Sequence, residues 1–307
     1  MGRRKKGRAI SGWVNLDKPY GLGSTPAVTQ IRRLFDAQKA GHAGTLDPLA
    51  DGVLPIALGE ATKTVSYLQD AAKSYRFTLA FGQATNTDDV EGAVIATSEV
   101  RPETAAIEAA LAQFTGEISQ VPPQFSAIRK DGVRAYAAAR AGEQVDLAPR
   151  PVRVDAFSLV ARPDATHASF SVDCGKGTYI RALARDLAAH LGACGHVTAL
   201  RRTRVGPFDE KTALGLDKLT SLGHYAPDLA ALDACLSPLM TALDDIPALA
   251  IDEDAASRVK QGQAISHPAA PRAAALLLLC NDKPVAIATS EGQSDAMSVK
   301  PLRVFNL

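Results

Sequence analysis

Hydrophobic and polar positions follow two different periods along this chain, and each change of period marks an element. Apolar residues at every second position indicate a strand, whereas spacings of three and four indicate an amphipathic helix. The apolar residues from Ile180 to Leu191 follow the helical spacing and predict a helix over 178–191. Residues 75–81 alternate as a strand does. The two patterns are mixed along the whole chain.

The same criteria predict the remaining elements. Ser24-Thr25-Pro26 is typical of a helix start, with a hydroxyl cap and a proline in the first turn. Further helices are expected at 24–35, 60–68, 102–114, 134–141 and 253–260. Further strands are expected at 12–16, 93–97, 152–160, 168–174, 197–205, 274–280, 285–289 and 299–304. Irregular alternation with hairpins favours an α+β fold with a mixed, mainly antiparallel sheet over a doubly wound parallel sheet.

Composition changes near Asp244-Asp245-Ile246-Pro247, and one helix and three short strands follow. We therefore expect three parts: a basic flexible tail over 1–10, a main domain over 11–245 and a small β-rich module over 246–307. Residues 41–55, which are dense in glycine, proline and aspartate, are expected to form a structured loop. Asp88–Gly92 is expected to be a turn.

The composition indicates a cytoplasmic globular protein. The chain has 307 residues, 46% of them hydrophobic, which is enough for a packed core. No stretch approaches the roughly 20 apolar residues of a membrane span. Four widely spaced cysteines form no C-x-x-C pair, so we expect reduced thiols in the cytoplasm rather than a disulfide framework or a zinc site.

The net charge of +1 conceals an uneven distribution. Residues 121–204 hold 13 basic and 7 acidic residues, whereas 205–307 hold 8 and 13. A basic region of this kind can receive a polyanion. Basic residues considered for phosphate contacts are Arg129, Lys130, Arg134, Arg201, Arg202 and Arg204.

Several common site motifs are incomplete. Gly21-Leu22-Gly23 has Pro26 where a dinucleotide fingerprint needs its third glycine. Gly175–Thr178 lacks the Gly-Lys-Ser/Thr order of a phosphate loop. The sequence contains neither an H-x-x-x-H pair nor a G-x-S-x-G element. These gaps weaken the cofactor, metal and serine-hydrolase interpretations of this sequence.

The segment Gly41–Pro55 carries the candidate chemistry. Asp47 lies between Leu46 and Leu49 in a glycine-rich loop, and Pro48 favours an extended backbone at the aspartate. Taken alone, Leu-Asp-Pro is a common turn, and most such aspartates only cap or turn the chain.

The whole segment, however, resembles the signature of the bacterial tRNA pseudouridine(55) synthase family, often called TruB. Five further stretches match that family in order, and the resemblance covers essentially the whole chain. They are Val14–Pro19, Leu58–Lys63, Lys73–Tyr75, Pro122–Ala127 and Gly177–Arg181.

The resemblance implies a pseudouridine synthase catalytic domain with a small PUA-like RNA-binding domain, and an activity that uses neither cofactor nor metal. It implies that Asp47 is the catalytic aspartate and that Arg181 pairs with it. It also implies that Tyr75 stacks on the target base and that His42 helps to hold the flipped nucleotide. Other residues implied to lie at the substrate are Tyr179, Leu200, Lys18 and Lys63.

This chemistry explains why such residues are needed. A uridine must leave its stack before its glycosidic bond can be broken, and an aromatic ring can hold the displaced base. Asp47 must be ionised, and an arginine in the first turn of a helix provides a fixed, permanently charged partner. Arg185, one turn later, is expected to be a solvated helix residue.

The sequence leaves the role of the aspartate open. Asp47 could attack C6 of uracil, attack the ribose carbon or abstract a proton. An RNA glycosidase and a non-catalytic RNA chaperone remain alternatives to the isomerase. For the isomerase we expect tRNA as substrate, bound at the T-arm and elbow, and a monomer that requires no protein partner.

Overall fold

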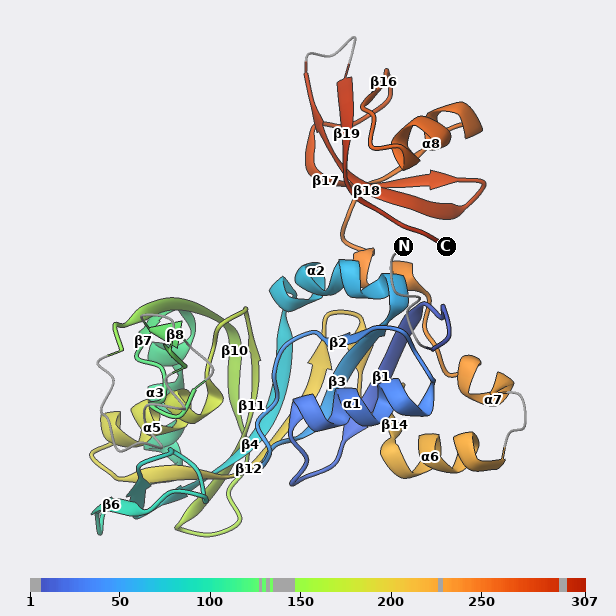
Figure 1. Ribbon diagram of the computed structural model, residues 1–307. Helices are drawn as coiled ribbons and strands as arrows, with labels where there is room; N and C mark the ends of the chain where they lie inside the picture. The colour runs from blue at the N-terminus through green and yellow to red at the C-terminus, as the bar shows by residue number, and fades with distance from the viewer. Residues whose placement is uncertain (1–6, 127–128, 131–132, 135–146, 226–228, 293–296) are drawn as a thin grey trace.

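The computed structural model describes residues 7–126, 129–130, 133–134, 147–225, 229–292 and 297–307 (Figure 1). Of the helix expected at 134–141, only Arg134 is described, and it ends a two-residue strand. The remainder of that prediction lies outside the described residues. Within these ranges, no helix is long and apolar enough to cross a membrane.

A mixed sheet of ten strands forms the centre of the main domain within the described residues. Its order is β14-β1-β3-β12-β4-β11-β10-β7, with β2 beside β3 and β13 beside β12. Only the β1–β14 and β3–β12 pairs are parallel, which confirms the α+β class with a mainly antiparallel sheet. The strands are β1 (Gly12–Lys18), β2 (Ala40–His42), β3 (Asp51–Leu58), β4 (Lys73–Phe81), β7 (Gly116–Gln120), β10 (Arg150–Ala161), β11 (His167–Cys174), β12 (Gly195–Val205), β13 (Phe208–Asp209) and β14 (Leu214–Gly215).

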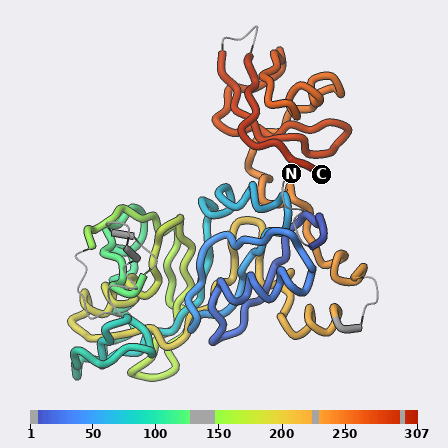
Figure 2. Tube along the Cα trace, in the orientation of Figure 1, coloured from blue at the N-terminus to red at the C-terminus, as the bar shows by residue number. Residues whose placement is uncertain are grey.

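Helices flank this sheet, and two short hairpins extend from it (Figures 1 and 2). The α-helices are α1 (Ser24–Leu34), α2 (Val65–Asp70), α3 (Thr104–Leu111), α5 (Ile180–His190), α6 (Leu216–Tyr225) and α7 (Ala230–Asp233). The 3-10 helices are η1 (Gly59–Thr64), η2 (Ala112–Phe114) and η3 (Leu239–Leu243). The hairpin strands are β5 (Gln83–Thr85) with β6 (Val94–Thr97), and β8 (Arg129–Lys130) with β9 (Val133–Arg134).

The predicted helix at 178–191 is confirmed as α5, and its apolar face packs on the sheet. Leu183 and Leu187 are fully buried in the same core as Phe77 and Phe170. These two phenylalanine rings stack with centroids 5.1 Å apart. Burial of this kind contributes about 1.5–3 kcal/mol per large apolar side chain. The helix start, which carries Arg181, is thereby held rigidly over the sheet.

Two local predictions were wrong. Residues 51–58 belong to strand β3, so the expected loop over 41–55 is confined to 43–50. Strand β3 is apolar at nearly every position because it lies between β1 and β12, with both of its faces covered. The helix expected at 60–68 is divided into the 3-10 helix η1 and the α-helix α2.

The C-terminal module is a five-stranded sheet with one helix, shown in orange and red in Figure 1. The expected helix and three strands are confirmed, and two shorter strands join them. Its elements are β15 (Ala248–Ala250), α8 (Glu253–Lys260), β16 (Ile265–His267), β17 (Ala273–Cys280), β18 (Lys283–Glu291) and β19 (Met297–Val304). Residues 246–307 hold six acidic and six basic residues, so the acidic excess counted over 205–307 belongs entirely to 205–245.

Both faces of this small sheet are buried, and the alternation along β17 shows how. Leu276 and Leu278 face the core of the module, whereas Leu277 belongs to a cluster shared with the main domain. Ile287 and Phe305 join that shared cluster, together with Trp13 of β1. Because successive strand residues point to opposite faces, a continuous apolar run is needed here.

The N-terminal segment is attached to the main domain from residue 8. The Arg8 backbone pairs with Ala37, and its side chain forms an ion pair with Asp233. Ile10 packs against the main core. The flexible tail expected over 1–10 is therefore ordered at its end, and residues 1–6 lie outside the described residues.

Candidate active site

The loop over 43–50 carries Asp47 and is anchored to α1 by Ser24. The buried Ser24 hydroxyl accepts a hydrogen bond from the Leu46 amide and donates one to the Leu46 carbonyl, both at 2.8 Å. The sequence predicted Ser24 to cap its helix, but the N-cap is Gly23, and no side chain caps there. The hydroxyl instead fixes the backbone immediately before the carboxylate.

Lys18 supports the same loop through a hydrogen bond to its backbone. Its buried ammonium donates to the carbonyls of Leu22 at 2.6 Å and Pro19 at 3.0 Å, and to that of Pro48 at 3.4 Å. Burial lowers the pKa of Lys18 to about 8, although the nearby Asp51 and Asp47 carboxylates oppose this shift. Lys18 thus lies close to Asp47, as the resemblance implies, but its donors hold the protein backbone.

Asp47 and Arg181 form the ion pair that the resemblance implies. Arg181 Nε lies 2.9 Å from Asp47 Oδ2. The guanidinium also donates to the Thr87 carbonyl at 2.6 Å and the Phe125 carbonyl at 2.9 Å. The arginine side chain is 7% exposed, whereas the carboxylate is 40% exposed. The pair therefore combines a fixed cation with a carboxylate that a substrate can reach.

Two further carboxylates, those of Asp88 and Asp89, lie beside this ion pair in the segment after β5. Asp89 Oδ2 is 3.4 Å from Arg181 Nη1, and Asp88 pairs with Arg185 at 3.1 Å. Burial raises the pKa of Asp88 to about 6, although Arg185 and Arg181 oppose this shift. The sequence predicted a plain turn here and a solvated Arg185. The periodicity of the sequence could not predict that Arg185 pairs with Asp88, because the two residues are almost 100 positions apart.

Two cavities meet at the Asp47–Arg181 pair. The larger, of about 430 Å³, is lined by the segment after β5, including Asn86 and Asp89. The smaller, of about 280 Å³, is lined by Tyr75, Tyr179 and Leu200, and we call it the tyrosine pocket. Asp47 and Arg181 line both cavities. The carboxylate is therefore accessible from two sides.

The tyrosine pocket collects residues from three elements. Tyr75 lies on β4 and pairs across the sheet with Arg202 of β12. Tyr179 precedes α5, and its backbone exchanges hydrogen bonds with the Gln120 amide at 2.8 and 3.2 Å. Burial raises the pKa of both tyrosine hydroxyls, so both remain neutral. The pocket thus offers two neutral aromatic rings and the apolar Leu200 beside a carboxylate.

Two residues expected at the substrate line neither cavity, and their expected contacts with the substrate stay predictions. His42, on β2, lines neither cavity, and burial lowers the pKa of its imidazole. Lys63 donates to the Val304 carbonyl at 2.6 Å and pairs with Glu60, whose carboxylate accepts from the Asn306 amide. Lys63 therefore joins the main domain to the C-terminal module.

Three arginines considered for phosphate contacts have partners within the protein. Arg202 is 1% exposed and donates to the carbonyls of Val53 at 2.8 Å and Gly44 at 3.2 Å. Arg204 bonds Ser74 Oγ at 3.1 Å. The side chains of Arg129, Lys130 and Arg134 lie outside the described residues.

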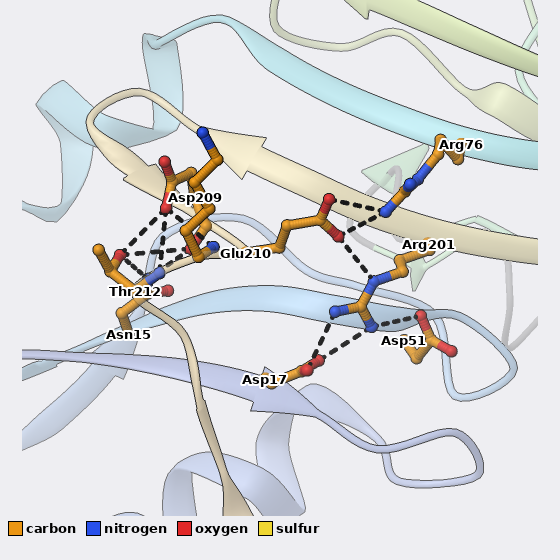
Figure 3. A network of polar contacts seen from close by, with 9 residues as sticks. Asn15, Asp17, Asp51, Arg76, Arg201, Asp209, Glu210 and Thr212 are labelled. Atoms are coloured by element: carbon orange, nitrogen blue, oxygen red, sulfur yellow. Dashed lines mark hydrogen bonds and ion pairs between the residues drawn. The ribbon is translucent and has the colours of Figure 1, made fainter.

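Arg201 is the third of these arginines and forms the centre of a surface network (Figure 3). It contacts Asp17 and Asp51 at 3.0 Å and Glu210 at 3.1 Å, while Arg76 donates to both carboxylate oxygens of Glu210. These contacts tie β1, β3 and β12 together beside the Asp47 loop.

Among the described residues, no group of three or more His, Cys, Asp or Glu side chains is arranged to hold a metal ion.

Solved structures share this architecture. A structure described as a Cbf5–Nop10–Gar1 complex matches with a TM-score of 0.76 and 27% identity, over 96% of this chain and 85% of that chain. An archaeal box H/ACA Nop10–Cbf5 complex matches with a TM-score of 0.74 and 26% identity, over 100% of this chain and 93% of that chain.

Sequence comparisons agree with this likeness. The family model for the N-terminal domain of TruB family pseudouridylate synthase matches residues 32–180. The model for the tRNA pseudouridylate synthase B C-terminal domain matches residues 181–244. A tRNA pseudouridine synthase B from Caulobacter sp. (strain K31) is 53% identical over the full length of both chains. One from Caulobacter vibrioides is 57% identical over 86% of this chain and 84% of that protein. The chain therefore belongs to the TruB family of pseudouridylate synthases.

Proposed function

We propose that this protein isomerises the T-loop uridine at position 55 of tRNA to pseudouridine, with Asp47 as the catalytic carboxylate. The Asp47–Arg181 pair at the edge of the tyrosine pocket carries the proposal. Arg181 is held by two backbone carbonyls and so presents a fixed charge to the carboxylate. A fixed cation of this kind orients a carboxylate through a charge-assisted hydrogen bond.

The flipped uridine enters the tyrosine pocket and lies against Tyr75. Flipping costs a few kcal/mol, and stacking on an aromatic ring returns about 1–3 kcal/mol. Asp47 then attacks C6 of uracil or the ribose carbon, or abstracts a proton. Each route needs an ionised carboxylate beside the bound base, which is the arrangement at the pocket edge.

The T-arm and elbow of the tRNA are the proposed binding partners, and the protein works as a cytoplasmic monomer without a partner protein. The sequence over 121–204 carries an excess of basic residues, which favours binding of a polyanion. The neutral C-terminal module is proposed to contact the acceptor stem through shape and a few contacts.

Asp47→Asn is expected to abolish pseudouridine formation in unmodified tRNA while tRNA binding survives, because the amide keeps the shape but loses the charge. Mapping of pseudouridine after incubation, with a filter-binding assay alongside, measures both effects. Asp155→Asn, at an exposed aspartate on β10, is the matched control and should act as the wild type does.

Normal turnover by the Asp47 variant would contradict the catalytic assignment. The mass of the RNA separates the other hypotheses. Isomerisation leaves the RNA mass unchanged, whereas a glycosidase releases uracil and adds water at the ribose, which lowers the RNA mass by the difference between the two. Wild-type protein that binds tRNA and produces neither change would instead be a binding protein or chaperone.

A further inference from the structure

Two buried cations that line the tyrosine pocket have no role yet in the proposed chemistry. Lys73, at the start of β4, is 8% exposed, and Arg202 is 1% exposed. Both line the pocket together with Tyr75. A methyl carbon built on Gly44 would lie 3.6 Å from Lys73 Cε and 3.7 Å from Arg202 Nη1. Both cations therefore pack directly against the loop that carries Asp47.

Neither cation has a carboxylate within ion-pair distance among the described residues. The Lys73 ammonium donates to the carbonyls of Gln69 and Ala71, both at 2.8 Å, and so uses two of its three N–H donors. Arg202 donates to backbone carbonyls and pairs across the sheet with Tyr75. Two neighbouring buried cations without a counter-ion are costly, and such arrangements are concentrated at functional sites.

The depth of these cations indicates which part of a flipped nucleotide they meet. A flipped base enters such a pocket by its ring, while the phosphates stay with the RNA backbone at the entrance. Lys73 and Arg202 are almost completely buried, whereas Asp47 is partly exposed. The groups of a bound uracil ring that can accept a hydrogen bond from such buried donors are its carbonyl oxygens.

We propose that Lys73, assisted by Arg202, donates to a uracil carbonyl oxygen and stabilises the negative charge that develops on the ring during the reaction. When the C1′–N1 bond breaks, both electrons stay with uracil and spread over O2 and O4. Asp47 compensates the electron-poor ribose carbon. The ring then turns, the electron pair of C5 forms the new bond to C1′, and the proton lost from C5 is replaced by one taken up at N1. Attack of Asp47 on C6 would also place charge on O4, so the role of Lys73 holds for either route.

This proposal rests on the proposed function, and single-turnover measurements on a T-arm RNA separate the two. Lys73→Met should lower the rate constant for pseudouridine formation about 100-fold, because preorganised donors act mainly on the transition state. The Kd of the RNA should change less than about threefold. Lys73→Arg should recover at least about tenfold of the loss, because it restores the charge.

Lys218→Met is the control, because it removes an exposed lysine on α6 that does not line the pocket. It should keep the wild-type rate. A Lys73→Met rate within about threefold of the wild type would overturn the inference. Equal losses of rate and affinity would also overturn it, since they would assign Lys73 to a phosphate. Absence of pseudouridine with the wild-type protein would instead refute the proposed function.

A pH profile of the wild-type protein tests the inference even if the methionine variant does not fold. Burial and the neighbouring Arg202 lower the pKa of Lys73 to about 8, so its charge is present below that pH and lost above it. The other charged or titratable groups facing it are Cys174, Asp70 and Lys176. The rate constant should therefore fall above about pH 8 in the wild type and stay level in Lys73→Arg. A wild-type rate that stays level to about pH 9.5 would overturn the proposal.

Discussion

At the residue scale, the two members of the Asp47–Arg181 pair differ in burial and therefore in role. Arg181 is enclosed, and three of its nitrogens are bound to Asp47, Thr87 and Phe125. Asp47 is partly exposed and faces two cavities. A permanently charged, planar group suits the enclosed position because it can satisfy several acceptors at once. The exposed partner remains available for chemistry.

Arg181→Lys is expected to lower turnover about 100-fold and RNA affinity less than about threefold. Lysine keeps the charge, but its single nitrogen cannot bind Asp47 and both backbone carbonyls in the same geometry. Single-turnover rates and RNA binding measure the two effects. Arg185→Lys, one turn along α5, is the matched control and should lose much less. Parallel losses of rate and affinity in Arg181→Lys would make Arg181 a binding residue only.

At the element scale, the Asp47 loop is positioned by elements that are distant from it in sequence. Ser24 of α1 holds Leu46, the residue before Asp47, and Lys18 of β1 holds Pro48, the residue after it. The pairing of β3 with β1 and β12 fixes the end of the loop at Asp51. A loop held at both ends places its carboxylate with little freedom, which catalysis requires.

Ser24→Ala is expected to lower the free energy of unfolding by about 1–3 kcal/mol and to reduce turnover. The substitution leaves the buried Leu46 amide and carbonyl without their partner. Urea denaturation and single-turnover rates provide the two measurements. Thr29→Val, on the same helix, removes an exposed hydroxyl that binds only Thr25, and should change stability by less than about 0.5 kcal/mol. Equal effects of the two variants would show that Ser24 does not anchor the loop.

At the scale of the whole molecule, the C-terminal module is packed onto the main domain and is more than an appended unit. Leu277, Ile287 and Phe305 share a buried cluster with Trp13 and Leu68. The Lys63 and Glu60 contacts with the end of β19 border this cluster. Deleting residues 246–307 would expose this apolar surface as well as removing any RNA contact. Single substitutions therefore separate the two roles better than truncation does.

Phe305→Ala is expected to destabilise the protein by about 3–5 kcal/mol, because it opens a cavity in the shared cluster. Leu302→Ala, three residues earlier and 46% exposed, should change stability by less than about 0.5 kcal/mol. Chemical denaturation followed by tryptophan fluorescence is suitable, since Trp13 is in the same cluster. A loss below about 1 kcal/mol for Phe305→Ala would indicate that the module contributes little to the stability of the main domain.

Local patterns in the sequence were sufficient for the elements that bury one face. Helix α5, strands β4, β11 and β12, and helix α8 were all predicted to within about two residues of their observed bounds. Periodicity succeeds there because a single apolar face against one core produces a regular spacing. The resemblance of the Asp47 loop and five other stretches indicated the family, since that information lies in short contiguous motifs.

Only the tertiary structure decided which distant side chains meet. Four such contacts join separate elements. They are the Arg185–Asp88 pair, the Ser24–Leu46 anchor, the Lys63 contact with the module and the grouping of Lys73 and Arg202 with Tyr75 in one pocket. Strand β3 was also missed, because burial on both of its faces removes the alternation of apolar and polar residues. The 3-10 helix η1 was missed because so short a helix has no clear spacing of apolar residues. Local sequence records which face of an element is buried, whereas the partner of a buried polar group depends on how the elements pack. The sequence by itself therefore determined the family, the class of fold and the Asp47 loop, and packing determined the environment in which Asp47 acts.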